Sequence, residues 1–319
     1  MSSIDDRDDQ DGSEPDPSAT DRPEPTASSA SIKDLLADGP TLSVEFFPPK
    51  TDEGIEKLSD TIDELEKLSC PAVPADRLSF VSITYGAGGS TRDRTRDLVV
   101  RVNERRPFPA MPHLTCMGHT RAEIDDLLAD YAANGVHNVL ALAGDPPADG
   151  SPVTGDFTYA TELIEAIRAA GDFSVGVAAH PELHPRSPDR AHDRRYLAEK
   201  LDAADFGITQ FFFDADDYFS MVEDLADRGC DTPVLPGVMP LLNPTTARRF
   251  AGIAGATFPE ELAARVEAAE DPAQRMAIAA DAAAELSAEL LERGVPGLHI
   301  YCMNRSDVVE AVLGRLDAG

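Results

Sequence analysis

Residues 42–50 read LSVEFFPPK, the pattern of a short buried strand with a single acid in its middle. Val44 and Phe46 supply apolar bulk, and two prolines end the run because proline has no backbone N–H to donate to a sheet. Glu45 interrupts this apolar run, and burial raises the pKa of a carboxyl because it disfavours the charged form. The stretch therefore predicts an acid with a special role, either in chemistry or as the structural partner of a buried arginine.

Seven further apolar runs of similar length follow along the chain. They lie at 78–86, 111–116, 138–145, 174–180, 207–214, 233–239 and 297–303. The segments between the runs place apolar residues at helical spacing. Eight short strands that alternate with helices predict an α/β fold, the (β/α)8 TIM barrel, with extra helix at about 258–293 before the eighth strand.

A doubly wound open sheet is the alternative arrangement of alternating strands and helices. A dinucleotide-binding sheet of that kind carries a glycine-rich turn after an early strand. The segment GAGGSTRDR at 86–94 is the one candidate for such a turn, and it does not match the G-x-G-x-x-G pattern. We therefore favour the barrel.

The composition is strongly acidic, with a formal net charge of -30 over 319 residues, of which 42% are hydrophobic. Nucleic-acid binding needs a basic footprint, so this charge argues against a nucleic-acid partner. Only five lysines occur, at positions 33, 50, 57, 67 and 200. An acidic, lysine-poor surface is typical of proteins from a high-salt cytoplasm, where salt screens the self-repulsion; an ordinary acidic protein is the alternative.

Residues 1–30 are rich in Asp, Ser and Pro and predict a disordered acidic tail, which leaves 31–319 for the catalytic barrel. No apolar run reaches the roughly 20 residues of a membrane helix, and the N-terminus has no hydrophobic signal core. We therefore expect a cytoplasmic protein without a membrane partner. The four cysteines form no CxxC pair, which predicts buried thiols and no metal site.

Polar side chains stand at the ends of nearly all the predicted strands. In a barrel of this kind the chemistry lies at the carboxyl ends of the strands. The residues at these ends are Glu45, Thr84, Tyr85, His113, Thr115, Asp145, His180, His184, Gln210, Asp214, Asn243, Asn304 and Arg305. Because apolar residues flank them, they predict a polar site on an apolar scaffold.

Eight motifs, one at each predicted strand, carry a family resemblance: SVEFFPPK, VSITYGAGGSTRDRT, HLTC, ALAGDPP, AAHPELHP, ITQFFFD, LPGVMPLLN and YCMNR. In this order, over about 40–315, they resemble methylenetetrahydrofolate reductase in its single-domain prokaryotic form. The resemblance implies an FAD-dependent enzyme that reduces 5,10-methylenetetrahydrofolate to 5-methyltetrahydrofolate, in the one-carbon metabolism that supplies methionine. It also implies ping-pong hydride transfer from NADH or NADPH through flavin N5, and a homo-oligomer.

The resemblance further implies roles for single residues. The methylene bridge accepts a hydride only after folate N10 is protonated and the ring opens, so a general acid is needed. Glu45 fits this role, with Phe47 on the same strand face as an apolar wall that keeps the carboxyl protonated. Gln210, Phe250 and Asp145 are also expected in catalysis. The folate positions implied are Glu45, Asp145, Gln210, Thr246, Phe250 and Arg305.

Structural alternatives stay open at three of these positions. Asp145 precedes two prolines, where an acid also favours a turn. Phe250 stands at helical spacing, where helix-face packing is the alternative. Arg305 could equally be an exposed arginine at a helix start.

For FAD the resemblance implies Thr84, Tyr85, Ala87, His113, Gly144, Asp145, Ala160, His180, His184, Asp193 and Lys200. Lys200 also stands out on its own, since no other lysine follows Lys67. A point charge there suits a pyrophosphate, and a local ion pair with Asp193 or Glu199 is the alternative. His180 and His184 are spaced like helical metal ligands, but the prolines beside them oppose a helix.

The chain departs from the family pattern near the expected phosphate site. Ala143 and Glu199 stand where relatives commonly have arginine, and His180 and Tyr196 replace a tyrosine and an asparagine. Compensation by Arg190, Arg194 or Arg195 is a hypothesis that follows from these losses. Two competing functions are a non-redox folate-binding barrel and a reductase subunit fed by a partner protein. No two-arginine clamp for a ribose phosphate is visible by spacing, which favours NADH over NADPH.

Overall fold

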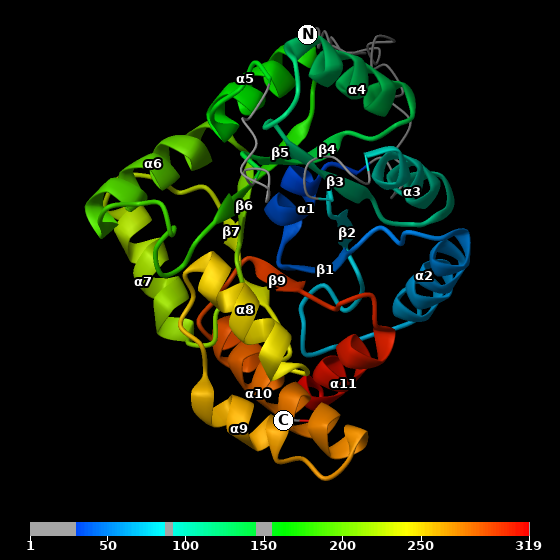
Figure 1. Cartoon of the computed structure of the whole chain (residues 1–319), viewed down its shortest axis with the longest axis vertical. Coiled ribbons are helices and arrows are strands. Elements are labelled where there is room, and N and C mark those ends of the chain that lie inside the picture. Colours follow the sequence, from blue (N-terminus) through cyan, green and yellow to red (C-terminus); the bar gives the residue numbers. More distant parts are fainter. Residues whose placement is uncertain (1–29, 87–91, 145–154, 319) are drawn as a thin grey trace, which may run out of the picture.

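The computed structural model describes residues 30–86, 92–144 and 155–318, and this part of the chain forms a parallel sheet surrounded by helices (Figure 1). The strands are β1 (Thr41–Phe46), β2 (Phe80–Ile83), β3 (Ala110–Thr115), β4 (Asn138–Leu142), β5 (Ser174–Ala179), β6 (Phe206–Thr209), β7 (Val234–Leu235), β8 (Gly237–Val238) and β9 (Gly297–Ile300). Their order in the sheet is β7-β6-β5-β4-β3-β2-β1-β9-β8. Because β7 and β8 are consecutive pieces of one run, this order leads back to its start. The predicted (β/α)8 TIM barrel is confirmed.

The seventh predicted strand is split. We predicted one strand at 233–239, whereas the structure has β7 and β8 with Pro236 between them. Pro236 has no N–H to donate, and its carbonyl oxygen accepts a hydrogen bond of 3.0 Å from His299 N. As a result β7 pairs with β6 and β8 pairs with β9, so the break lies where the two edges of the sheet meet.

The helices of the described residues follow the strands as the alternation predicts. They are α1 (Ile32–Asp38), α2 (Asp52–Leu65), α3 (Arg92–Arg105), α4 (Arg121–Ala133), α5 (Ala160–Ala170), α6 (Arg190–Ala203), α7 (Ala215–Ala226), α8 (Pro244–Ala254), α9 (Glu260–Glu267), α10 (Pro272–Glu292) and α11 (Ser306–Leu316). Helices α9 and α10 lie within the predicted helical stretch before the last strand, which confirms it. Within the described ranges, no helix has the length and apolar character needed to cross a bilayer.

Side chains at the helix starts explain where many of the helices begin. An oxygen of the preceding residue accepts a backbone N–H of the first turn, which would otherwise lack a partner. Such caps are made by Thr51, Thr120, Asp189, Asp214, Asn243 and Asp271.

Alternation along the strands separates an outer core from an inner one. Val44 and Phe46 belong to the apolar layer between sheet and helices. The inner core contains Ile32, Phe80, Met111, Leu140, Phe206, Ile208 and Leu235.

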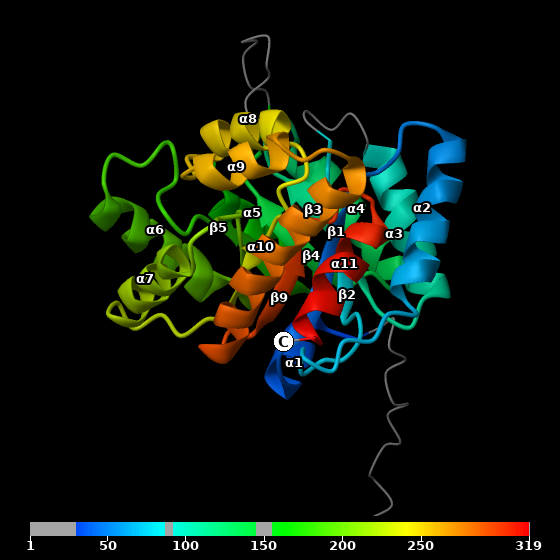
Figure 2. The same cartoon turned by 90° about the horizontal axis from the view of Figure 1, so that it is seen from below.

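Helix α1 supplies the inner core with Ile32, which is fully buried. The N–H of Ile32 donates to Asn138 Oδ1 at 2.7 Å, and the N–H of Lys33 donates to Ser174 Oγ at 3.0 Å. These contacts hold α1 against the amino ends of β4 and β5. Figure 2 shows α1 at one end of the barrel and α8 with α9 at the other. Since α1 closes the amino end, the site is expected at the carboxyl ends of the strands.

Candidate active site

Glu45 lies one residue before the end of β1 and faces the inside of the barrel. Its neighbours Val44 and Phe46 point to the helices, so alternation turns Glu45 inward together with Ser43. In the sheet Glu45 is opposite Ser82 of β2, and Ser43 is opposite His299 of β9. The Glu45 residue is 8% exposed, so its carboxyl lies in a largely dry environment.

Two imidazoles face the Glu45 carboxyl. His113 Nε2 lies 3.3 Å and His299 Nε2 lies 3.9 Å from Glu45 Oε2. The His113 contact is an ion-pair contact and not a hydrogen bond, and His113 Nε2 is a buried atom without a hydrogen-bond partner among the described residues. The carboxyl and the two rings therefore form a compact charged cluster inside the barrel.

Ser43 determines the tautomer of His299. The Ser43 hydroxyl donates to the carbonyl of Leu298 at 3.2 Å, and Ser43 Oγ lies 2.8 Å from His299 Nδ1. With its proton committed to the carbonyl, the serine oxygen accepts the Nδ1–H of the ring. The other ring nitrogen, Nε2, then faces Ser82 Oγ at 3.5 Å and the Glu45 carboxyl.

The prediction that Glu45 stays protonated is wrong. Burial raises the pKa of this carboxyl, but the contacts and charges of His113 and His299 outweigh burial and lower the pKa to about 2. The predicted apolar wall is absent because Phe47 is 39% exposed at the mouth of the barrel. The carboxyl faces two imidazoles instead, and these stabilise its ionised form.

Sequence reasoning missed His299, Ser43 and Ser82. His299 is fully buried, and its ring stacks on Phe80 and meets Tyr301 edge-on. The available signal was the alternation in β9, where His299 is the polar residue between the outward-facing Leu298 and Ile300.

Gly144, two residues after the end of β4, has a backbone that only glycine adopts easily. Its φ is +89°, and a Cβ there would lie 3.1 Å from Thr115 Cβ and 3.2 Å from Met117 Cβ. The missing side chain therefore lets this turn pack closely on Thr115 and Met117. Thr84 is half-buried at the end of β2, and its N–H donates to Phe46 O at 2.9 Å.

His180 and Lys200 lie close together near the end of β5. Burial, His184 and Lys200 lower the pKa of His180 to about 3, so this ring is neutral. Lys200 Nζ donates to Ala178 O at 2.6 Å, and burial lowers its pKa to about 8. The alternative of an ion pair with Glu199 is not what the structure shows, since Glu199 faces Arg195 at 3.8 Å.

Asp193 shapes the loop that follows β5. Its Oδ1 accepts the N–H of His184 at 3.0 Å and the hydroxyl of Ser187 at 2.9 Å, and its Oδ2 pairs with Arg194 at 2.5 Å. The rings of His180 and His184 meet edge-on at 4.6 Å between centroids. Asp193 thus positions the two predicted flavin-side histidines.

The three candidate replacement arginines have protein partners. Arg194 is fully buried, and its guanidinium donates to the carbonyl groups of His180, Pro181 and Glu182. Arg190 pairs with Asp224 at 2.6 Å, and Arg195 lies over the ring of Tyr196 and beside Glu199. Arg194 therefore ties the loop after β5 together.

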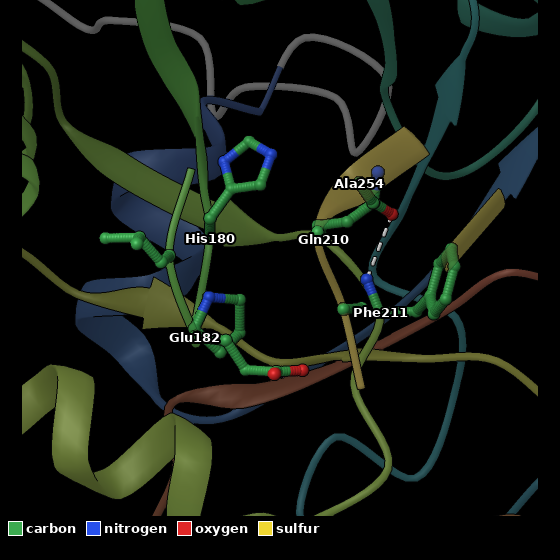
Figure 3. Close-up of a pocket in the computed structure, with 9 residues that line it drawn as sticks. His180, Glu182, Gln210, Phe211 and Ala254 are labelled. Atoms are coloured by element: carbon green, nitrogen blue, oxygen red, sulfur yellow. Dashed lines mark hydrogen bonds between the residues drawn. The ribbon is translucent and has the colours of Figure 1, made fainter. Parts of the chain in front are cut away.

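A pocket separates the loop after β5 from α8. Its lining includes His180, Glu182, Gln210, Phe211 and Ala254, and Figure 3 shows His180 and Gln210 on different sides of it. The Oε1 atom of Gln210 accepts the N–H of Phe211 at 3.0 Å, which orients the side-chain amide.

Other predicted positions are placed around this mouth. Phe250 is half-buried on α8 and packs on the apolar cluster of Phe211, Met239 and Leu241. The N–H of Thr246, in the first turn of α8, donates to Asn243 Oδ1 at 3.0 Å.

Two predicted positions have other local contacts. Arg305 is exposed at the residue before α11, as its structural alternative proposed, and it also pairs with Asp307 at 2.5 Å. The Tyr85 hydroxyl lies 3.2 Å from His119 Nε2, and burial raises the pKa of Tyr85 to about 12. Ala160 is the first residue of α5. The predictions for Ala87 and Asp145 fall outside the described residues.

Comparison with known proteins identifies relatives over most of the chain. A family model described as methylenetetrahydrofolate reductase matches residues 31–317. The 5,10-methylenetetrahydrofolate reductases of Salmonella typhimurium and Escherichia coli are 35% identical over 274 residues, which is 85% of this chain and 88% of theirs. The probable methylenetetrahydrofolate reductase (NADH) of Oryza sativa is 35% identical over 302 residues, and the match spans half of its length.

A solved structure supports the fold. An uncharacterized protein from Clostridium thermocellum that binds two copies of 5-methyl-5,6,7,8-tetrahydrofolic acid aligns with a TM-score of 0.58. The alignment covers 90% of this chain and 98% of that protein at 15% identity. At this identity the likeness shows a shared fold.

Proposed function

The chain belongs to the methylenetetrahydrofolate reductase family, and we propose that it reduces 5,10-methylenetetrahydrofolate to 5-methyltetrahydrofolate with FAD as its cofactor. The observation that carries the proposal is the inward-facing Glu45, which lies with His113 and His299 below the carboxyl mouth of the barrel. This cluster can deliver one proton inside a dry site. The names of the bacterial relatives supply the substrate, and the cluster supplies the proton that its reduction needs.

The residues around the mouth fit a flavin. Neutral His180 can exchange hydrogen bonds without adding charge, and Lys200 offers a cation for a phosphate. His113 Nε2 is buried and has no hydrogen-bond partner within the described part of the chain, as expected of a group that a ligand completes. FAD, when bound, would accept a hydride from a reduced nicotinamide and donate it to the folate from N5.

Glu45 acts as the proton donor to folate N10 in this proposal. Before folate binds, the carboxyl is ionised, because its pKa is about 2. A folate over the mouth excludes water and raises the cost of keeping the carboxylate charged. Glu45 then takes up a proton, for which His113 Nε2 and His299 Nε2 are the nearest exchange partners, and passes it to N10. Gln210 and Phe250 orient the ring systems, with Thr246 and Arg305 contributing to folate binding.

NADH is the proposed electron donor. The rice relative and a 36% identical Arabidopsis thaliana relative both carry NADH in their names. Ping-pong exchange of donor and folate at one mouth agrees with the position of Gln210, which lines the pocket between the loop after β5 and α8.

The test separates the two half-reactions of the purified protein, loaded with FAD in molar KCl under anaerobic conditions. We expect Glu45→Gln to keep flavin reduction by NADH and to slow folate-dependent reoxidation by roughly 100- to 10,000-fold, the usual contribution of a general acid. Glu261→Gln, an exposed change on α9, is the control and should retain both rates. Folate turnover at the parent rate by Glu45→Gln would remove the assignment. A protein that retains no flavin would favour a non-redox folate-binding barrel, and a flavin that neither nicotinamide reduces would favour a partner protein as donor.

A further inference from the structure

The carboxyl end of β1 extends beyond its strand partner. Pairing between β1 and β9 ends with Val44 opposite Ile300. The backbone groups of Glu45 and Phe47 therefore lie past the last paired position on this side. On the other side the ladder continues, since the N–H of Thr84 donates to Phe46 O at 2.9 Å.

Side chains of the turn after β9 take over where the ladder stops. Cys302 Sγ donates to Glu45 O at 3.1 Å. Asn304 Nδ2 donates to Phe47 O at 2.8 Å, and the N–H of Phe47 donates to Asn304 Oδ1 at 2.8 Å. The Asn304 amide thus pairs with both backbone groups of one residue, as a peptide group of a neighbouring strand would. These three bonds form what we call the β1 clamp.

The turn that carries the clamp has an unfavourable backbone. Met303 and Asn304 have φ values of +54° and +58°, in the left-handed region. Among the described non-glycine residues only Asp76 shares this feature, and it lies in the loop before β2, at the amino end of the barrel. A left-handed residue other than glycine costs about 1–2 kcal/mol, although asparagine tolerates this region better than most. Two such residues in succession bring the Asn304 amide back against β1.

We infer that Asn304 is a positioning residue for the proton donor: through the β1 clamp it sets the place of the Glu45 carboxyl opposite His113 and His299. This inference rests on the proposed function. Glu45 lies between the clamped carbonyl of its own residue and the doubly bonded Phe47, so its backbone cannot shift without breaking the clamp. The 3.3 Å distance to His113 Nε2 depends on that placement. Displacing a reacting group by about 1 Å can slow a reaction roughly 100-fold.

Asn304→Gly is the decisive variant, because glycine keeps the left-handed backbone and removes both amide hydrogen bonds. We expect folate-dependent reoxidation of the flavin to slow by about 10- to 100-fold, with flavin reduction by NADH within about twofold of the parent. Amide exchange at Phe47 should rise at least about fivefold, since one backbone hydrogen bond is lost. Asn304→Asp keeps the acceptor for the Phe47 N–H, so it should fall between the parent and Asn304→Gly in both readouts.

Asp76→Gly is the matched control, since it also places glycine at a left-handed residue, but one far from the mouth. It should change neither half-reaction nor exchange at Phe47. Equal rates of folate-dependent reoxidation in Asn304→Gly and Asp76→Gly would overturn the inference. An equal loss of flavin reduction and of folate-dependent reoxidation in Asn304→Gly would also overturn it, because it would indicate general damage to the protein. If the parent protein itself fails to reduce methylenetetrahydrofolate, the proposed function fails, whatever the exchange at Phe47 shows about the clamp.

Discussion

Replacing Lys200 with methionine should stabilise the protein at neutral pH while weakening its hold on FAD. The ammonium is enclosed near the end of β5, where Nζ donates a hydrogen bond to Ala178 O at 2.6 Å. Burial lowers its pKa from 10.5 to about 8, with Asp193 opposing this only in part. Without an anionic ligand, the folded protein therefore carries an unfavourable buried cation.

The size of the effect follows from the pKa. Each pKa unit corresponds to about 1.36 kcal/mol, so the lowered pKa represents about 3 kcal/mol at neutral pH. Lys200 as a whole is only half-buried, and solvent screening reduces this cost. Methionine also forfeits the bond to Ala178, which is worth about 1 kcal/mol. We expect a net gain of about 1–2 kcal/mol in the free energy of unfolding.

The pH dependence identifies the cause. Because the folded-state pKa lies below the unfolded-state pKa, the cost is fully present below about pH 8 and disappears as the pH rises to 10.5. The gain in Lys200→Met should therefore be largest at pH 7 and vanish near pH 10.5.

Urea denaturation of the flavin-free protein in molar KCl, at several pH values between 7 and 10.5, measures this gain. Lys67→Met, a change at an exposed lysine, is the control and should show no such trend. A Lys200→Met protein no more stable than its parent at pH 7, or a gain that persists at pH 10.5, would refute the reasoning. FAD titration of Lys200→Met tests the proposed phosphate contact separately. We expect the dissociation constant for FAD to be about tenfold larger, as for the loss of a charged hydrogen bond. An unchanged dissociation constant would exclude the contact between Lys200 and a phosphate.

Three further outcomes follow from the structure. His299→Asn keeps a donor for Ser43 but removes Nε2, so burial should raise the pKa of Glu45. The carboxylic C=O band of Glu45 in infrared difference spectra should then persist to higher pH, and an unchanged titration midpoint of this band would contradict the role of His299. Ile32→Ala should cost about 2–5 kcal/mol in urea denaturation because it empties the closed end of the barrel, and a loss below about 1 kcal/mol would show that α1 does not seal it. Gly144→Ala should cost about 1–2 kcal/mol in urea denaturation because of its left-handed backbone and its close packing on Thr115 and Met117, and an unchanged free energy of unfolding would contradict this.

The alternation of apolar runs and amphipathic segments in the sequence was sufficient to predict the barrel. Strand length and period depend on local residue order, so the sequence of 42–50 predicted a strand with one acid, Glu45, among apolar residues. The helical stretch before the last strand was readable for the same reason. Helix α1 was not predicted, and the split at Pro236 was missed because the pairing of β7 with β6 and β8 with β9 is set by barrel closure.

The electrostatics of the site depended on contacts between distant parts of the chain. The sequence around Glu45 shows phenylalanines and predicts a raised pKa, yet the structure brings His113 and His299 to the carboxyl and reverses the direction. The pKa of Glu45 depends on the groups within a few ångströms of its carboxyl, and His113 and His299 reach it from β3 and β9. The β1 clamp has the same origin, since Asn304 and Phe47 are 257 positions apart. Residue order thus determined that an acid stands at the end of β1, and the tertiary structure decided which bases face it and how firmly it is held.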